Sequence, residues 1–348
     1  MRSFWLKLVL AVILLGNLAA GGAWLLIQRN LDTPLPLQAE RAYELTPGAN
    51  FNQVINELKQ AGILDETRTL RWYGRLSGEA RKIKAGEYAI LPGTTPRQLL
   101  AMFVAGKVRQ YALTLVEGWN FAQVMEAVNR HPALRHSLPG LDNATIMARL
   151  GHPGEHPEGR FLPDTYHFPK GLSDVDFLKR AYRAMQTVLE AEWAGRAPGL
   201  PFETPYEALI LASIVEKETG LARERRAIAG VFVRRLQKGM RLQTDPTVIY
   251  GMGEAYRGNI RKKDLERDTP YNTYRRSGLP PTPIAMPGRD AIHATLHPDD
   301  SDNIYFVARG DGSHQFSATL KEHNQAVIKY QLKGRPRPFS SYNPDKAD

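Results

Sequence analysis

The sequence predicts an α+β protein with an N-terminal transmembrane helix, a small α+β region and a larger α+β region behind it. Near the N-terminus an uncharged apolar run is long enough to span a bilayer. Behind it, helical periodicity recurs along the chain, and short strand-like runs precede several of the helical patterns. With 348 residues, of which 43% are apolar, the chain can bury one large or two medium-sized cores.

Leu8 to Ile27 is a run of 20 residues without a charge, which matches the thickness of a bilayer core. Arg2 and Lys7 precede it, so the positive-inside rule places the N-terminus in the cytoplasm. A cleavable signal peptide is the alternative, with a cleavage site within Ala19–Ala23. The length of the run favours a retained anchor, and in either case the rest of the chain lies outside the cytoplasm.

An internal repeat follows the anchor. Gly48–Val54 (GANFNQV) and Gly118–Val124 (GWNFAQV) agree at five of seven positions, and Gly93–Leu99 is a looser copy. Each copy follows a strand-like run and leads into a helical pattern, which predicts a strand, a glycine turn, an Asn or Thr N-cap and a helix. Common descent is the preferred explanation, although convergence of turn chemistry would give the same residues.

Most of the other elements are expected towards the C-terminus. Ser173 should cap a helix that runs to Trp193, because Asp176 stands three residues later. The remaining predictions are helices at 205–220, 222–238 and 320–332, a hairpin of 303–308 with 315–318, and a disordered tail from residue 334.

Glu218 breaks the pattern of the helix that is expected between Pro205 and Gly220. The apolar stripe of that helix is formed by Ala208, Leu211, Ile214 and Val215, and Glu218 falls in the middle of it. Desolvation on such a face raises the pKa of a carboxyl group, as a general acid working near neutral pH requires. Two structural alternatives remain: an ion pair with Arg223, Arg225 or Arg226, and an early helix end that leaves Glu218 in water.

Three loop-like segments combine acids, amides, aromatic rings and prolines: 157–169, 241–251 and 271–288. Such side chains suit carbohydrate, because sugar rings stack on aromatic faces and sugar hydroxyls need dense hydrogen bonding. Loops whose aromatic residues simply pack are the plainer interpretation.

Composition and motifs exclude several function classes. The chain has no cysteine, which rules out disulfides, thiolate metal sites and a cysteine nucleophile. The net charge of +10 favours a polyanionic partner, but no nucleic-acid-binding signature accompanies it, so we expect anionic lipid or an acidic polymer. His152–His156 (HPGEH) has metal-ligand residues, but its Pro-Gly pair disrupts helical ligand spacing. We therefore expect neither a metal nor a cofactor.

Several long motifs together resemble the endolytic murein transglycosylase family (MltG, YceG-like). They are Leu211–Thr219 (LASIVEKET), Gly239–Gly251 (GMRLQTDPTVIYG) and Tyr271–Tyr274 (YNTY) with Gly278–Pro281 (GLPP). The resemblance covers nearly the whole chain, and it extends to Glu158–Tyr166, Tyr305–Val307, His314–Phe316 and His323–Asn324.

The resemblance implies an enzyme anchored by a single pass in the bacterial inner membrane, with most of the chain in the periplasm. It implies a LysM-like subdomain, a catalytic domain that cleaves nascent peptidoglycan strands internally, and 1,6-anhydro-muramic ends as products that terminate elongation. Peptidoglycan synthases are expected partners. The expected divisions are 1–29 (cytoplasmic tip and transmembrane helix), 30–40 (linker), 41–110 (LysM-like), 111–333 (catalytic) and 334–348 (tail).

The catalytic residue implied by the resemblance is the second glutamate of the VEKET motif, Glu218. A lytic transglycosylase needs one carboxyl group, because the sugar's own 6-hydroxyl attacks the anomeric carbon. Motif membership and chemistry suggest substrate-binding roles for Gln243, Asp245, Tyr250, Tyr271, Asn272 and Tyr274, with Glu158 as a further, less defined candidate.

Two other functions fit the same residues. A non-catalytic peptidoglycan-binding scaffold would use the repeats for glycan and keep Glu218 as a structural residue. A hydrolase of the same polymer would pair Glu218 with a second acid, either Glu158 or Asp245.

Overall fold

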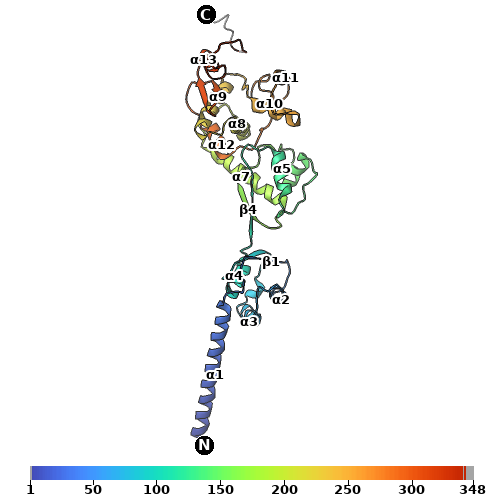
Figure 1. Cartoon of the computed structure of the whole chain (residues 1–348), viewed down its shortest axis with the longest axis vertical. Helices are drawn as coiled ribbons and strands as arrows, with labels where there is room; N and C mark the ends of the chain where they lie inside the picture. The colour runs from blue at the N-terminus through green and yellow to red at the C-terminus, as the bar shows by residue number, and fades with distance from the viewer. Residues whose placement is uncertain (1, 340, 342–348) are drawn as a thin grey trace. The chain divides into compact units, whose positions relative to one another are not determined.

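A computed structural model describes residues 2–339 and 341 of the chain. By its internal contacts the chain forms two compact units, which are described separately here. Unit 1 runs to Tyr111 and includes His167–Gly171, and unit 2 comprises Ala112–Tyr166 and the chain from Leu172 onward. Figure 1 follows these segments in colour from the blue N-terminal helix to the red C-terminal elements.

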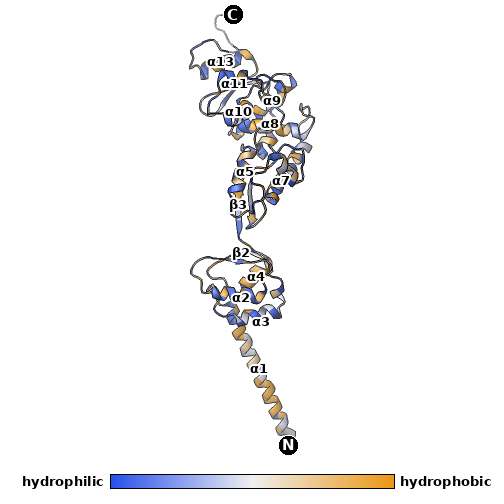
Figure 2. Ribbon diagram, turned by 90° about the vertical axis from the view of Figure 1, so that its right-hand side faces the viewer, coloured by the Kyte–Doolittle hydropathy of each residue, from blue (hydrophilic) through white to orange (hydrophobic). Residues whose placement is uncertain are grey.

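The chain begins with a long apolar helix, α1 (Arg2–Asp32). From Phe4 to Asp32 this helix is long and apolar enough to cross a membrane, and its apolar side chains between Phe4 and Leu26 are exposed. Figure 2 shows the corresponding run of hydrophobic residues. The helix continues to Asp32, inside the expected linker 30–40. This segment packs within unit 1: Leu31 and Leu35 are buried in its core, and Asp32 pairs with Arg97 at 2.8 Å.

Unit 1 is a small two-stranded α+β unit. Strands β1 (Arg41–Leu45) and β2 (Gly86–Ile90) pair antiparallel, with Tyr43 opposite Tyr88. Between and after them lie α2 (Phe51–Gln60), α3 (Arg68–Leu76), the short 3-10 helix η1 (Glu79–Arg81) and α4 (Pro96–Ala105).

The repeat predicted from the sequence is present as repeated local structure. Gly48, Gly93 and Gly118 have φ values of +83°, +86° and +76°, a region that glycine occupies without steric cost. The N-caps that follow them are Asn50, Thr95 and Asn120, at the starts of α2, α4 and α5 (Phe121–Arg130). Each N-cap side chain accepts a hydrogen bond from the backbone N–H of a glutamine three residues later. The predicted turn and N-cap are therefore confirmed in all three copies.

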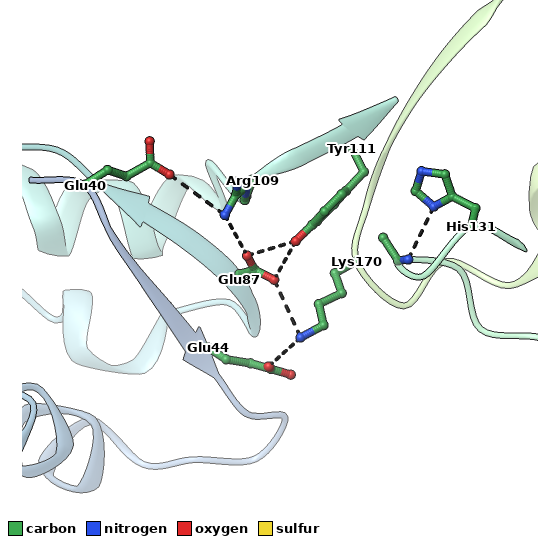
Figure 3. Close-up of polar contacts among 8 residues, drawn as sticks. Glu40, Glu44, Glu87, Arg109, Tyr111, His131 and Lys170 are labelled. Carbon is green, nitrogen blue, oxygen red and sulfur yellow. Dashed lines mark hydrogen bonds and ion pairs between the residues drawn. The ribbon is translucent and has the colours of Figure 1, made fainter. Parts of the chain in front are cut away.

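The segment at 167–171 contributes to a cluster of charges around Glu87 of β2 (Figure 3). Tyr111 donates a hydrogen bond to Glu87 at 3.0 Å, and Arg109 does so at 3.3 Å. Lys170 Nζ lies 2.9 Å from Glu44 and 3.6 Å from Glu87. Lys170 follows β4 (Thr165–Pro169), which pairs with β3 (Gln110–Thr114). The buried carboxylate of Glu87 is thus neutralised by two cations.

Unit 2 is built around α8 (Pro205–Glu218). This helix packs against four others: α7 (Asp174–Ala194), α9 (Arg225–Gln237), α10 (Asp245–Met252) and α12 (Arg289–Leu296). Because it is surrounded, every residue from 208 to 215 is buried. The single apolar stripe expected for this helix was therefore too narrow, and Ser213 is buried with the apolar residues, where it donates to the Ile210 carbonyl.

The other elements of unit 2 lie around this centre. They are α6 (Asn143–Leu150), η2 (Ala222–Glu224), η3 (Gly253–Ala255), α11 (Lys262–Glu266), β5 (Tyr305–Ala308), β6 (His314–Ser317) and α13 (Leu320–Tyr330). Strands β5 and β6 form the expected antiparallel hairpin. Of the expected tail, residues 340 and 342–348 lie outside the described residues, whereas Phe339 packs against the cluster of Val307, Ala326 and Val327.

Candidate active site

Glu218 is the last residue of α8, so the helix ends two residues before the predicted boundary at Gly220. Thr204 caps the start of the helix, and Pro205 occupies its first turn. Although it stands at the helix end, the Glu218 side chain is mostly buried rather than left in water. Burial is the main cause that raises the pKa of its carboxyl group, as the sequence predicted for a residue on a buried face.

The two carboxyl oxygens of Glu218 differ in their partners within the described part of the chain. Thr244 Oγ1 donates a hydrogen bond to Oε1, and no group in the described part of the chain donates to Oε2. That hydrogen bond, His314 and Arg235 lower the pKa of Glu218, whereas the negative charge of Asp245 raises it. Desolvation outweighs the lowering effects, so the carboxyl group retains its proton to a higher pH than an exposed glutamate.

The ion pair considered as a structural alternative does not form among the described residues. Arg225 Nη1 lies 2.9 Å from Asp290, and its Nη2 lies 3.9 Å from Glu216. Arg226 donates to the backbone carbonyl of His297 at 2.7 Å. Both arginines are thus engaged elsewhere, and Glu218 remains without a cationic partner in direct contact.

The wall beside Glu218 is built from two predicted loops, which threonines hold together. The Thr244 backbone N–H donates to Thr273 Oγ1 at 3.1 Å, and Thr247 Oγ1 lies 2.9 Å from the same atom. Gln243, next in the chain, has φ of +54°, which is uncommon for a residue other than glycine, and its N–H donates to the Thr273 carbonyl. These threonines were not singled out from the sequence, because nothing local marks a contact between segments almost thirty residues apart.

Asp245 and Tyr274 lie together near Glu218. Tyr274 OH donates to Asp245 Oδ1 at 2.6 Å, and burial raises the pKa of Tyr274. The negative charge of Asp245 acts on Glu218 as described above, so these two predicted residues belong to the electrostatic surroundings of the acid. Asn272 differs: it is 1% exposed, and its side-chain NH2 group donates to the carbonyls of Leu265 and Arg267. In this structure Asn272 thus braces the loop, and its substrate-binding role stays a prediction.

Glu158, Tyr250 and Tyr271 line a cavity of about 680 Å³ in unit 2. Glu158 is 3% exposed; its Oε1 accepts from the Phe121 N–H and its Oε2 from Tyr250 OH, both at 3.0 Å. Burial raises the pKa of Glu158 to about 7. Tyr271 OH lies 2.8 Å from Thr282 Oγ1, and the Tyr250 and Tyr271 rings meet edge to face. These three residues are thus brought together by the fold.

This cavity lies beside the Glu218 wall, because its lining includes Lys217 and Pro246, the chain neighbours of Glu218 and Asp245. A larger cavity of about 1180 Å³ lies in unit 1 and is lined by Arg75, Arg81 and Lys82 but by no acidic residue. It therefore offers no group that could act as a general acid.

Two further residues near Glu218 were assigned no role from the sequence. Arg235 is buried and donates to the carbonyls of Leu242 at 2.6 Å and Ile304 at 2.7 Å. His314 Nδ1 lies 2.8 Å from Glu224 Oε2. Both residues lower the pKa of Glu218, so they favour the carboxylate that remains after proton donation.

One group in the described part of the chain has the residue types and proximity of metal ligands. Glu192 of α7, His293 of α12 and His297, which follows α12, bring one ligand atom each within 4.8 Å of the others. Glu192 lies far from the two histidines in the chain, so no local motif marks the whole group, unlike the HPGEH run at His152–His156. None of the three residues lines the cavity beside Glu218.

Comparison with known proteins places these features in a family. The model of the YceG-like family matches residues 43–329. The endolytic murein transglycosylase of Bacillus subtilis (strain 168) is 30% identical over 90% of this chain and 91% of its own length. That of Streptococcus pneumoniae (strain D39) is 26% identical over 92% of this chain, which covers 64% of the pneumococcal protein.

A solved structure agrees with these relatives. The crystal structure of a YceG-like protein from Listeria monocytogenes superposes with a TM-score of 0.54 at 29% identity. The match covers 83% of this chain and 99% of the Listeria chain. The family model and the relatives each span most of the sequence, including the helix that ends at Glu218. The chain therefore belongs to the YceG-like family.

Proposed function

We propose that this chain is an endolytic murein transglycosylase, a lyase that cleaves peptidoglycan glycan strands, with Glu218 as its catalytic residue. The activity follows from membership of the YceG-like family and from the relatives in Bacillus subtilis and Streptococcus pneumoniae that carry this name. The observation that supports Glu218 is a desolvated carboxyl group with a raised pKa and one oxygen that no group of the described chain occupies.

The proposed reaction uses this one carboxyl group twice. Protonated Glu218 donates its proton to the glycosidic oxygen as the bond between that oxygen and the anomeric carbon of MurNAc breaks. The 6-hydroxyl oxygen of the same MurNAc then attacks the anomeric carbon, and the Glu218 carboxylate accepts the proton of that hydroxyl. The products are a 1,6-anhydro-MurNAc end and a GlcNAc with a free hydroxyl. No water is consumed, and Glu218 finishes in its starting protonated state.

The rival hydrolysis would need a second carboxylate to activate water or to attack the sugar. Glu158 is poorly suited to this role, because both of its oxygens accept hydrogen bonds from the chain. Asp245 is exposed and accepts from Tyr274, so it is the second acid that a hydrolase would use. In the lytic reaction we assign Asp245 to stabilising the positive charge that develops on the sugar ring.

The other candidates have supporting roles in this proposal. Gln243, at the wall that carries Thr244, and Tyr274 would orient the sugars next to the cleaved bond, whereas Tyr250 and Tyr271 would contact sugars in the neighbouring cavity. Glu158 supports Tyr250 rather than the substrate itself.

The cellular setting is also part of the proposal. Helix α1 would anchor the chain in the bacterial inner membrane with its N-terminus in the cytoplasm, which places unit 2 and the part of unit 1 that follows α1 in the periplasm. Residues 41–110, within unit 1, would be the LysM-like subdomain, and the basic cavity of this unit suits an anionic polymer. Peptidoglycan synthases are the expected protein partners, because strand cleavage would terminate their product.

Digestion of purified glycan strands by the full-length protein, followed by mass spectrometry of the ends, tests this function. We expect 1,6-anhydro ends. Reducing ends would instead identify a hydrolase, and intact strands that remain bound would identify a scaffold. Glu218→Gln should bind strands without cutting them, so substantial cleavage by that variant would remove Glu218 from the mechanism.

A further inference from the structure

We propose that the cavity of about 680 Å³ in unit 2 is a subsite that recognises the acyl carbonyl groups of N-acetylated sugars, and that Glu158 is the positioning residue that joins its walls. This inference rests on the proposed function, because it names what part of the substrate the cavity takes. The cavity volume lies in the range of small-ligand sites. The case depends on the hydrogen-bond donors and aromatic rings that line it.

The first two donors come from the capping box of α5. Asn120 Oδ1 accepts from the Gln123 N–H at 2.9 Å, and Gln123 Oε1 accepts from the Asn120 N–H at 3.0 Å. Both oxygens are therefore used, and the side-chain NH2 groups of both residues donate to no atom of the described chain. Because both residues line the cavity, these NH2 groups are free to meet a ligand.

Two more donors complete the set. His156 Nδ1 accepts from the Glu158 N–H at 3.2 Å, which assigns the ring proton to Nε2 in the neutral imidazole. Burial lowers the pKa of His156, so the neutral form prevails near neutral pH. Lys217 Nζ donates to the Gly118 carbonyl at 3.2 Å, and its other two N–H groups meet no acceptor among the described residues. All four residues line the cavity.

The carboxylate of Glu158 does not accept hydrogen bonds from these donors, because the Phe121 N–H and Tyr250 OH already donate to its two oxygens. The site thus presents N–H groups to oxygen acceptors, such as the carbonyl of an acetamido group. Phe121, Tyr250, Tyr256 and Tyr271 add aromatic rings on which sugar rings can stack. A sugar with a free amine would instead place a protonated ammonium group next to the N–H donors of the site. It would bind less well, because an ammonium group has no oxygen to accept their hydrogen bonds.

Glu158 acts through other residues. It fixes the first residue of α5, where the capping-box donors lie, to Tyr250 of α10 on another wall of the cavity. An apolar substitute would leave the buried Phe121 N–H and the Tyr250 hydroxyl without that acceptor. Glutamine keeps one oxygen for Phe121, and its NH2 group can donate to the Tyr250 hydroxyl, so it should preserve the spacing of the walls.

The test uses the full chain with Glu218→Gln, so that ligands stay intact, and compares tetramers of N-acetylglucosamine and of glucosamine by calorimetry. We expect the acetylated tetramer to bind more tightly, and Gln123→Met to weaken its binding about tenfold, as loss of one hydrogen bond implies. Gln98→Met is the matched control, because Gln98 has the same capping-box role in α4 but lies outside the cavity. Equal binding of the two tetramers, or equal effects of the two substitutions, would overturn the subsite.

Glu158 is tested by the kinetics of strand cleavage. Glu158→Leu should raise KM more than it lowers kcat, and Glu158→Gln should restore KM towards the wild-type value. Wild-type KM in both variants would contradict the positioning role, and if Glu158→Leu does not fold, the Gln123 and Gln98 comparison decides the subsite. Because strand cleavage by the wild-type protein is scored separately by its anhydro ends, failure of the subsite is distinct from failure of the proposed function.

Discussion

Glu218 and Glu158 are two glutamates of unit 2 whose carboxyl groups are both desolvated but differ in their hydrogen bonds. Desolvation raises the pKa of both. Glu158 has donors on both oxygens and is 3% exposed. Among the described residues Glu218 has a donor on one oxygen only, and it remains partly exposed. Burial therefore supplies a carboxyl group that holds its proton, but only the free oxygen of Glu218 can deliver that proton to a substrate.

The largest expected effect is on catalysis by Glu218. Glu218→Gln should lower the rate of strand cleavage by about 10²–10⁴-fold, because an amide cannot donate and then accept the proton. Glu216→Gln is the control on the same helix: Glu216 is buried, its pKa is raised by burial, and it accepts from the Gly288 N–H at 2.9 Å, which glutamine can also do. Equal loss of rate in the two variants would mean that any buried acid at this helix end matters equally.

The second effect concerns stability around Glu158. Its pKa is raised from 4.5 to about 7, so its contribution to stability is present below pH 4.5 and is lost as the pH rises through 7. The shift corresponds to about 3 kcal/mol. Hydrogen exchange of the α5 amides should therefore become faster between pH 5 and pH 8, after correction for intrinsic exchange, and Glu158→Gln should lack this component. The same pH dependence in both proteins would show that Glu158 is already ionised at pH 5.

Asp245 should have a smaller effect than Glu218, and the part of it that acts through the pKa of Glu218 should depend on pH. Its negative charge raises the pKa of Glu218, so Asp245→Asn should lower that pKa and move the alkaline loss of activity to lower pH. A shift of one pH unit would reduce the rate on the alkaline side about tenfold, as measured from a pH profile of kcat/KM. Asp268→Asn is the control, since Asp268 is engaged with Arg276 at 2.8 Å and does not act on Glu218. An unchanged pH profile in Asp245→Asn would show that the charge of Asp245 does not raise the pKa of Glu218.

Local features of the chain were predictable because local residues determine them. The turn glycines, the Asn and Thr N-caps and the β5–β6 hairpin each depend on a few neighbouring positions, and each is present. Glu218 was also found locally, because a carboxyl group on a buried helix face violates the helical pattern within one turn. The width of the apolar surface on α8 was not predictable, since it depends on which helices surround it.

The hydrogen-bond partners of the two glutamates were not predictable from the sequence for the same reason. Thr244 is 26 positions from Glu218, and Tyr250 is 92 positions from Glu158. Arg235 donates to backbone carbonyls but belongs to no recognisable motif. The burial of Asn272 also depends on tertiary packing that its motif does not reveal. Residue chemistry thus indicates which groups are candidates for the site, whereas tertiary contacts decide which of them can face a ligand.

The smallest expected effect comes from removing one hydroxyl from each carboxyl group, with Thr244→Val beside Glu218 and Tyr250→Phe beside Glu158. Each hydroxyl lowers the pKa of its glutamate, so each substitution should raise that pKa further. Thr244→Val should move the alkaline limb of the kcat/KM profile to higher pH, with a few-fold change in rate at neutral pH. Tyr250→Phe should leave that limb in place and raise KM, because Glu158 holds no proton that the reaction uses. If Tyr250→Phe moved the limb as Thr244→Val does, Glu158 would belong to the proton-transfer machinery and the contrast between the two carboxyl groups would fail.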